Sequence, residues 1–217
     1  MSVLNWENIE AAELSNDPYP HFIVDQAIDL DAINKISQAF PDIGFAGLVP
    51  LNHVPNEGGF AELITDLQSQ KLKQIIGNKL GVDLESMPPL ITVRSHARQR
   101  DGKIHVDTFD KKVTILLYLN EDWQHEAGRL RVLRDGNSLD NYKEEITPLI
   151  GKMFVFKVTD NCWHGHKPLQ AKRRALMLNY MADQASYNKH LKKHNRSAAW
   201  KRLKRKIGLI KEPVEIG

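Results

Sequence analysis

Two short stretches of the sequence hold residues whose types and spacing suit metal chemistry. Residues 103–107, KIHVD, place His105 and Asp107 two positions apart, and residues 162–166, CWHGH, add two histidines. Side chains at i and i+2 of a β-strand project from the same face, so His105 and Asp107 could share one metal ion. Two histidines and one carboxylate bind Fe(II) and leave positions open for reactants. The alternative is a surface strand that displays two polar residues, because a chance His-x-Asp is common.

Four further residues suit the binding of a small dicarboxylate. Arg173 and Arg174 begin a predicted strand downstream of the second stretch, and a guanidinium grips a carboxylate through two hydrogen bonds. The two arginines point to opposite faces, and the alternation of apolar residues does not decide which one faces inward. Thr114 and Tyr118 share one face of another predicted strand, and their hydroxyls could contact the same carboxylate.

Short segments rich in β-branched and aromatic residues must position these side chains. The predicted strands are 90–96, 103–107, 112–120, 129–133, 152–158 and 174–181. Turn residues separate them, and six strands within about ninety residues indicate a sandwich or a jelly-roll barrel.

The residues before this β region are predicted to be mainly helical. The segments are a short strand and a helix in 18–41 with Asp29 or Asp31 as the cap, a loop in 42–59, and one amphipathic helix in 60–80. The fold class is therefore mainly β with flanking helices. We expect a single domain over residues 1–186, with a helical part in 1–89 and a β-core in 90–182.

Composition limits the class of protein. The chain has 217 residues, of which 41% are hydrophobic and 26% charged, as in ordinary globular proteins. It holds no run of eighteen apolar residues, which excludes a membrane span, and it begins without a secretory signal. The single cysteine, Cys162, cannot form an internal disulfide, which fits a reducing, cytoplasmic location.

Positive charge is concentrated near the C-terminus. Residues 187–211 hold seven Lys, three Arg and no acid, whereas residues 1–186 hold 20 basic and 25 acidic residues, a formal −5. Trp200, Leu203, Ile207 and Ile210 recur at helical spacing, so 187–217 is predicted to be a basic amphipathic helix. Such a helix can dock on its own acidic body, lie on an anionic membrane surface or bind a polyanion. Nucleic acid is disfavoured, because the β region shows no aromatic-interleaved basic groove.

The order of the motifs HVD, VTILLYLNEDW, GRLRV, WHGHKP and RR resembles that of the 2-oxoglutarate/Fe(II)-dependent dioxygenases, especially the prolyl 4-hydroxylase-like branch. The resemblance covers residues 90–182. It implies a double-stranded β-helix of jelly-roll or cupin-like form, with Fe(II) and 2-oxoglutarate as cofactors and ascorbate as a candidate reductant. The implied reaction hydroxylates a C–H bond and converts 2-oxoglutarate into succinate and CO2.

The resemblance also implies roles for the candidate residues. Iron is held by His105, Asp107 and one downstream histidine, which in the family lies four residues before a proline and nine or ten before a basic residue. His164 fits this spacing, whereas His166 does not and is left as a neighbour or a solvated turn residue.

The far carboxylate of 2-oxoglutarate is expected to bind Arg174, at the +10 offset that the branch prefers. Arg173, at +9, is the alternative. Tyr118 and, with weaker support, Thr114 are expected to contribute hydroxyls to the same carboxylate.

Sequence leaves the substrate open among small molecules, peptides and sugars. Arg98 and Arg100 in the predicted loop 96–103 are compatible with an anionic substrate group, although a solvated loop explains them as well. The alternative function is a metal-free or zinc-loaded cupin-like binding module. Such a module would keep the three metal ligands but would not need Tyr118 or a buried arginine.

Overall fold

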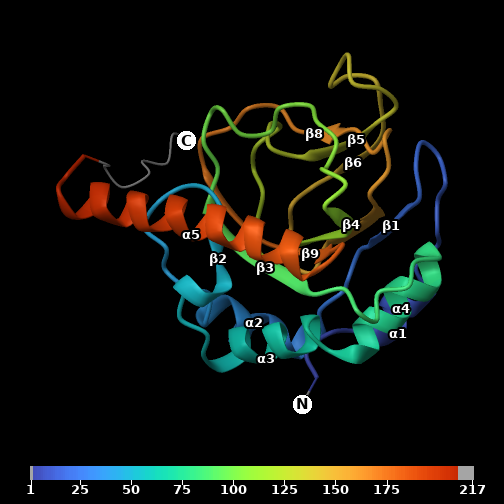
Figure 1. The fold of residues 1–217 in the computed structure, drawn as a ribbon, viewed down its shortest axis with the longest axis horizontal. Helices are drawn as coiled ribbons and strands as arrows, with labels where there is room; N and C mark the ends of the chain where they lie inside the picture. The colour runs from blue at the N-terminus through green and yellow to red at the C-terminus, as the bar shows by residue number, and fades with distance from the viewer. Residues whose placement is uncertain (1, 210–217) are drawn as a thin grey trace.

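Two antiparallel sheets form the centre of the computed structural model, which describes residues 2–209 (Figure 1). The larger sheet has the order β1-β7-β4-β9-β3-β2, and its strands are β1 His21–Val24, β2 Val49–Pro50, β3 Pro89–His96, β4 Lys111–Tyr118, β7 Met153–Lys157 and β9 Lys172–Met181. The smaller sheet has the order β6-β5-β8, and its strands are β5 Leu130–Leu133, β6 Tyr142–Ile146 and β8 His164–Gly165.

Both faces of the larger sheet are buried, and successive residues of each central strand contribute to opposite faces. Toward the smaller sheet point Leu116, Tyr118, Phe154, Phe156 and Ala175, which pack with Leu130, Val132 and Ile146. Toward the helices point Ile115, Leu117, Val155, Leu176 and Leu178. The first set surrounds the site described below, and the second forms the main hydrophobic core.

Helices from the N-terminal part cover the second face (Figure 1). They are α1 Trp6–Ala11, α2 Leu30–Gln38, α3 Gly58–Leu67 and α4 Gln70–Leu80, with a short 3-10 turn, η1 Leu51–His53, in the predicted loop. The same part of the chain also supplies β1 and β2 to the larger sheet, so it is not only helical.

Two predictions of regular structure are wrong. Residues 60–80 form two helices, because the Ser69 side chain accepts the Leu72 N–H at 3.2 Å and starts α4 anew. Residues 103–107 are not a strand; they make one bridge, in which the backbone N–H groups of His105 and His164 each donate to the other's carbonyl, at 3.1 and 3.0 Å.

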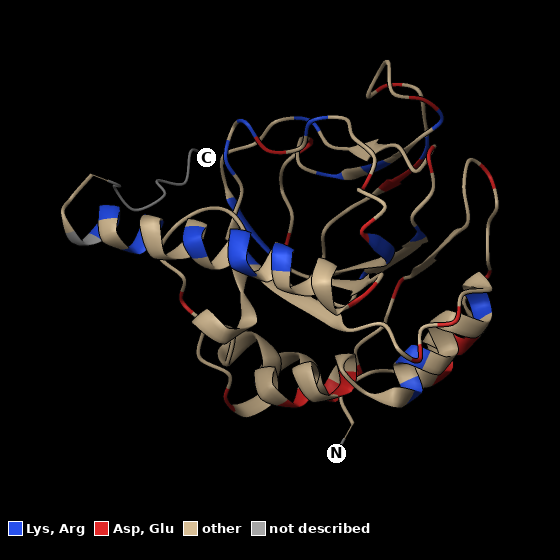
Figure 2. Cartoon of the chain, viewed as in Figure 1, with Lys and Arg blue, Asp and Glu red and all other residues tan. Residues whose placement is uncertain are grey.

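The basic tail forms the long helix α5, Gln184–Lys206, which packs against β2, β3 and β9 (Figures 1 and 2). Ala198 is fully buried, whereas Trp200, Leu203 and Ile207 are exposed. Ile210, the last residue of the predicted apolar stripe, lies outside the described residues. Within residues 2–209, no helix is long and apolar enough to cross a membrane.

Candidate active site

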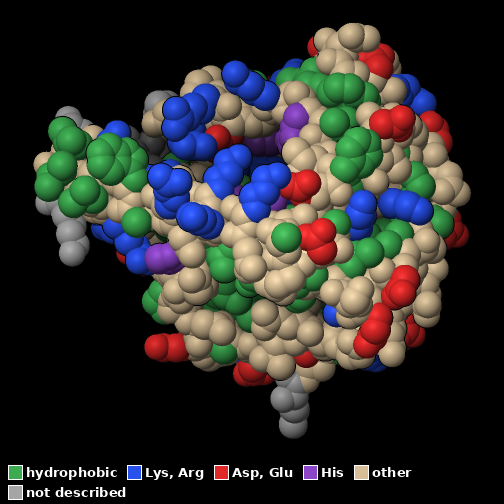
Figure 3. Space-filling model, in the orientation of Figure 1, with side chains coloured by type: hydrophobic (Ala, Val, Ile, Leu, Met, Phe, Trp, Pro, Cys, Tyr) green, Lys and Arg blue, Asp and Glu red, His purple; other side chains and the backbone are tan. Residues whose placement is uncertain are grey.

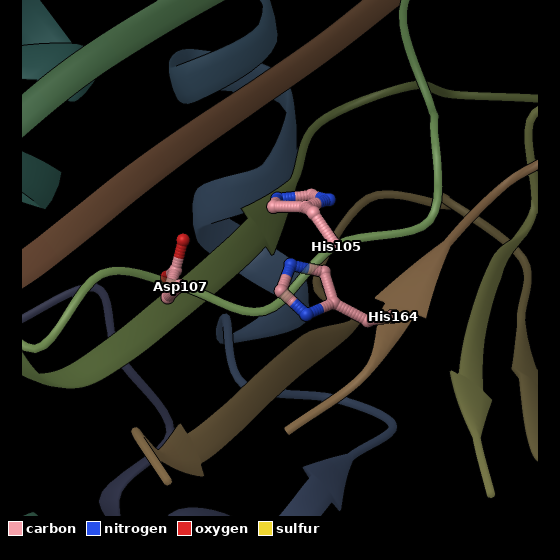
Figure 4. A group of neighbouring side chains, drawn as sticks. All are labelled: His105, Asp107 and His164. Atoms are coloured by element: carbon pink, nitrogen blue, oxygen red, sulfur yellow. The ribbon is translucent and has the colours of Figure 1, made fainter. Parts of the chain in front are cut away.

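His105, Asp107 and His164 come together at the open end between the two sheets (Figure 4). One ligand atom from each lies within 4.8 Å of the others. The bridge between His105 and His164 brings the two histidines side by side, with ring centres 4.2 Å apart. The three residues predicted as metal ligands from the sequence therefore form one cluster, and its N, N, O donor set suits Fe(II).

Backbone carbonyls orient both imidazoles. His105 Nδ1 lies 2.9 Å from the carbonyl oxygen of Lys103, and His164 Nδ1 lies 2.8 Å from that of Cys162. A carbonyl only accepts, so each Nδ1 carries the proton and each Nε2 keeps a lone pair for a metal. Burial, and then the neighbouring His105, lower the pKa of His164 to about 4, so His164 is neutral at pH 7 as a ligand must be.

Asp107 is held as an ionised carboxylate. Lys111 Nζ donates to its Oδ1 at 2.8 Å, and Thr114 Oγ1 donates to its Oδ2 at 2.6 Å. Burial alone would raise the pKa of Asp107, but the charge of Lys111 and these hydrogen bonds lower it overall. Thr114 was expected at the cosubstrate carboxylate; the structure instead places its hydroxyl on the metal-ligand carboxylate.

A cavity of about 350 Å³ opens beside the three ligands. Its walls come from one face of β3 and β9, from β8, and from α5; among the lining residues are Thr92, Arg94, His166, Arg173, Met177, Asn179 and Lys193. A cavity of this size accommodates a small ligand.

Arg173, rather than Arg174, faces this cavity. Arg173 is 5% exposed, and its Nε donates to the carbonyl of Gly128 at 3.0 Å. Arg174 lies on the other face of β9 with its guanidinium 4.9 Å from the ring centre of Phe40, in the helical layer. The expectation that Arg174 reaches the cosubstrate is therefore wrong, because strand alternation turns it away from the cavity.

Tyr118, the tyrosine expected at the cosubstrate carboxylate, lies beside Arg173, the alternative to Arg174. Its hydroxyl is 3.4 Å from Arg173 Nη2, and the guanidinium carbon lies 5.1 Å from its ring centre. Burial raises the pKa of Tyr118, and the nearby Arg173 only partly opposes this, so the phenol stays protonated and can donate a hydrogen bond.

Several cavity residues were not assigned from the sequence. Arg94 Nη1 pairs with Asp101 at 2.6 Å, and His166 is 6% exposed, with its pKa lowered to about 3 by burial and then by Arg173. His190 and Lys193 of α5 also line the cavity, although the tail is remote from the metal ligands in sequence. The inward helical spacing of His190, His194, Ala198 and Lys201 was the signal that could have revealed this wall.

Residues 92–182 match the family model described as the 2OG-Fe(II) oxygenase superfamily. The match covers nearly all of the predicted β-core, 91 of the 217 residues of the chain. The match encloses all three metal ligands, Tyr118 and Arg173, and it confirms the predicted family, the oxygenase class of the enzyme, and Fe(II) and 2-oxoglutarate as its cofactors. No curated protein matches the chain in sequence.

Solved structures with a similar fold include prolyl 4-hydroxylases. A Pseudomonas putida prolyl-4-hydroxylase superposes with a TM-score of 0.57 at 16% identity, over 83% of this chain and 96% of that one. A prolyl 4-hydroxylase from Phytophthora capsici superposes with a TM-score of 0.55 at 17% identity, over 84% of this chain and 67% of that one. A Trichoplax adhaerens prolyl hydroxylase was solved with a hypoxia inducible factor peptide fragment. It superposes with a TM-score of 0.53 at 18% identity, over 77% of this chain and 86% of that one. At these identities the likeness concerns the fold, and it confirms the predicted double-stranded β-helix.

Proposed function

We propose that the chain is a dioxygenase that hydroxylates a C–H bond of its substrate while 2-oxoglutarate is converted into succinate and CO2. In this proposal His105, Asp107 and His164 hold Fe(II), and Arg173 binds the far carboxylate of 2-oxoglutarate. The observation that carries the proposal is the buried charge of Arg173, which has no carboxylate within salt-bridge distance in the described part of the chain.

A buried guanidinium without a counter-charge is unfavourable, because desolvation is not offset by a partner. The two hydrogen bonds of Arg173 go to neutral groups, the Gly128 carbonyl and the Tyr118 hydroxyl. A dicarboxylate bound with one end at the metal would bring a carboxylate to the other end of the same cavity. Arg173 and Tyr118 would then both donate to it.

The protein's own part in the reaction is to position the metal ligands and to exclude water from the cavity. When bound, the ferrous ion supplies the redox chemistry that couples 2-oxoglutarate decarboxylation to substrate oxidation. Lys111 and Thr114 keep Asp107 charged and fix its orientation. Leu116, Leu130 and Met177 line the cavity with apolar surface, which limits the access of water to the reacting groups.

The matched pair Arg173→Ala and Arg174→Ala tests this assignment. We expect Arg173→Ala to weaken 2-oxoglutarate binding to the Mn(II)-loaded protein by about a hundredfold, because a charged bidentate contact is lost. Arg174→Ala should change that affinity by less than about threefold, since its side chain lies outside the cavity. Calorimetric titration with 2-oxoglutarate measures both, and equal losses in the two variants would refute the assignment.

A second function, association with an anionic surface, is supported by the outer end of α5. Trp200, Leu203 and Ile207 are 58, 49 and 59% exposed there, and basic residues surround them. We propose that this end contacts an anionic membrane surface, because exposed aliphatic and aromatic groups together with positive charge favour it. Wild-type protein should co-sediment with vesicles that contain phosphatidylserine, and Trp200→Glu should not. Equal sedimentation of both proteins would contradict this.

A further inference from the structure

The face that α5 turns toward the body is unusually polar for a docked helix. His190, His194, Ala198 and Lys201 recur at helical spacing along it, and Ala198 is the one apolar residue among the four. His190 and His194, with the adjacent Lys193, line the cavity that holds the metal ligands. Figure 3 shows Lys and Arg side chains gathered around a hollow in this region, with histidine visible inside it. The inner face of α5 is thus a wall of the active site.

Positive charge exceeds negative charge around this cavity. The lysine and arginine side chains that line it are Arg94, Lys111, Arg173 and Lys193. The carboxylate that lines it is Asp107. Asp101, which does not line the cavity, forms a salt bridge with Arg94 and offsets its charge. Fe(II) and 2-oxoglutarate carry opposite double charges and cancel each other when both are bound. An excess of two positive charges therefore remains for a third ligand.

One of these lining cations, Lys193, lies on α5, and Lys201 lies further along the helix without lining the cavity. Lys193 and Lys201 have no carboxylate within salt-bridge distance among residues 2–209, whereas Lys189 and His190 share Asp110, at 2.8 and 3.0 Å. Lys201 Nζ lies beside Gly47 and 5.7 Å from the Phe45 ring centre. Burial, and then the charges of Arg98 and Arg94, lower its pKa to about 8.

Two buried polar side chains in the same cavity lack a partner. Thr92 Oγ1 and Asn179 Oδ1 make no hydrogen bond with any described residue, and the two residues are 2% and 3% exposed. They lie on the adjacent strands β3 and β9 and line the cavity together with Lys193. Buried polar atoms in folded proteins are nearly always bonded, so this pair is suited to meet polar groups of a ligand.

We propose that the space between α5 and strands β3 and β9 is the substrate subsite, and that it takes a small substrate with an anionic group, a carboxylate or a phosphate, held by Lys193. Thr92 and Asn179 receive a hydroxyl or amide donor of the same substrate. The inference rests on the proposed dioxygenase function, because it treats the cavity as the place where cosubstrate and substrate meet.

Sulfate serves as the probe for the anionic subsite. We expect it to bind full-length protein loaded with Mn(II) and 2-oxoglutarate, and Lys193→Gln to weaken that binding about tenfold, as for the loss of one charged hydrogen bond. Lys192→Gln, at the adjacent position that does not line the cavity, should leave it unchanged. No sulfate binding, or equal binding by Lys193→Gln, which would mean an adventitious ion only, overturns the proposal.

Matched substrate pairs identify the anionic group. With iron and 2-oxoglutarate, we expect succinate formation to be stimulated by some small acids but not by their amides, or by phosphate monoesters but not by their alcohols. For an active acid, Lys193→Gln should raise KM far more than it lowers kcat. Stimulation by the neutral partners alone, or displacement of sulfate by short single-stranded RNA but by no small acid, would contradict the proposal. If wild-type protein forms no succinate, the dioxygenase function fails, while the sulfate titration still reports on the subsite.

Discussion

His164 and His166 are two positions apart, yet their environments differ. The His164 ring lies against His105 and has Nδ1 fixed by the Cys162 carbonyl. The backbone N–H of His166 donates to the Gly102 carbonyl at 2.9 Å. Burial, and to a lesser extent the charge of Arg173, lower the pKa of the His166 imidazole. One histidine therefore belongs to the metal cluster and the other to the arginine end of the cavity.

This difference gives a prediction for metal binding. His164→Ala should weaken Mn(II) binding by about a hundredfold or more, because it removes a direct metal ligand. Loss of a group that only orients a ligand already weakens metal binding by about 10- to 100-fold. His166→Ala should keep the wild-type affinity within about threefold. Equilibrium titration of the metal-free proteins measures both constants. A larger loss in His166→Ala would shift the ligand assignment by two residues.

Residue types predicted the metal cluster well but the arginine poorly. His105, Asp107 and His164 follow from donor chemistry and motif spacing, which the fold preserves. The arginine assignment depends on which face of β9 points inward, and both faces of that strand are buried. Hydrophobic alternation carries no signal in such a strand, so the choice between Arg173 and Arg174 needed the structure.

At the scale of elements, α5 contributes one small residue to the main hydrophobic core, and Lys189 and His190 near its start pair with Asp110. Ala198 is fully buried and belongs to the main core, whereas the next residue, Ala199, is exposed. A small side chain at this position lets the helix backbone approach the sheet closely, and that approach brings Lys193 to the cavity.

Enlarging this contact should loosen the helix. Ala198→Trp is expected to lower the free energy of unfolding by about 1–3 kcal/mol, because it overpacks the core. Ala199→Trp, as the matched control, should change it by less than about 0.5 kcal/mol. Urea denaturation followed by circular dichroism measures both, and equal stability of the two variants would show that α5 is not anchored at Ala198.

Elements with strong apolar patterns were predicted correctly, and those set by polar contacts were not. The strands around 112–120 and 152–158 appear as β4 and β7 with nearly the expected bounds. By contrast, the break before α4 depends on a single serine cap, and β6, with the sequence YKEEI, has too few apolar residues to signal a strand. Tertiary pairing with β5 stabilises β6 instead.

At the scale of the whole molecule, distant parts of the chain meet at one cavity. The metal ligands come from the segment before β4 and from β8, the arginine from β9, and the outer wall from the C-terminal helix (Figure 1). In sequence, the basic residues of the tail lie well after the metal ligands, whereas in the fold Lys193 lines the cavity. Sequence distance was misleading here, because β9 leads directly into α5 and the helix folds back along β3.

The most direct test of the dioxygenase function is succinate formation from 2-oxoglutarate by full-length protein in air, before any substrate is known. With Fe(II), we expect slow succinate release that stops when the iron is chelated, returns when Fe(II) is restored, and is absent with Zn(II). Succinate at the no-protein rate with Fe(II) would contradict the account and favour the metal-free or zinc-loaded binding module. Release that persists without iron would contradict the iron-dependent reaction.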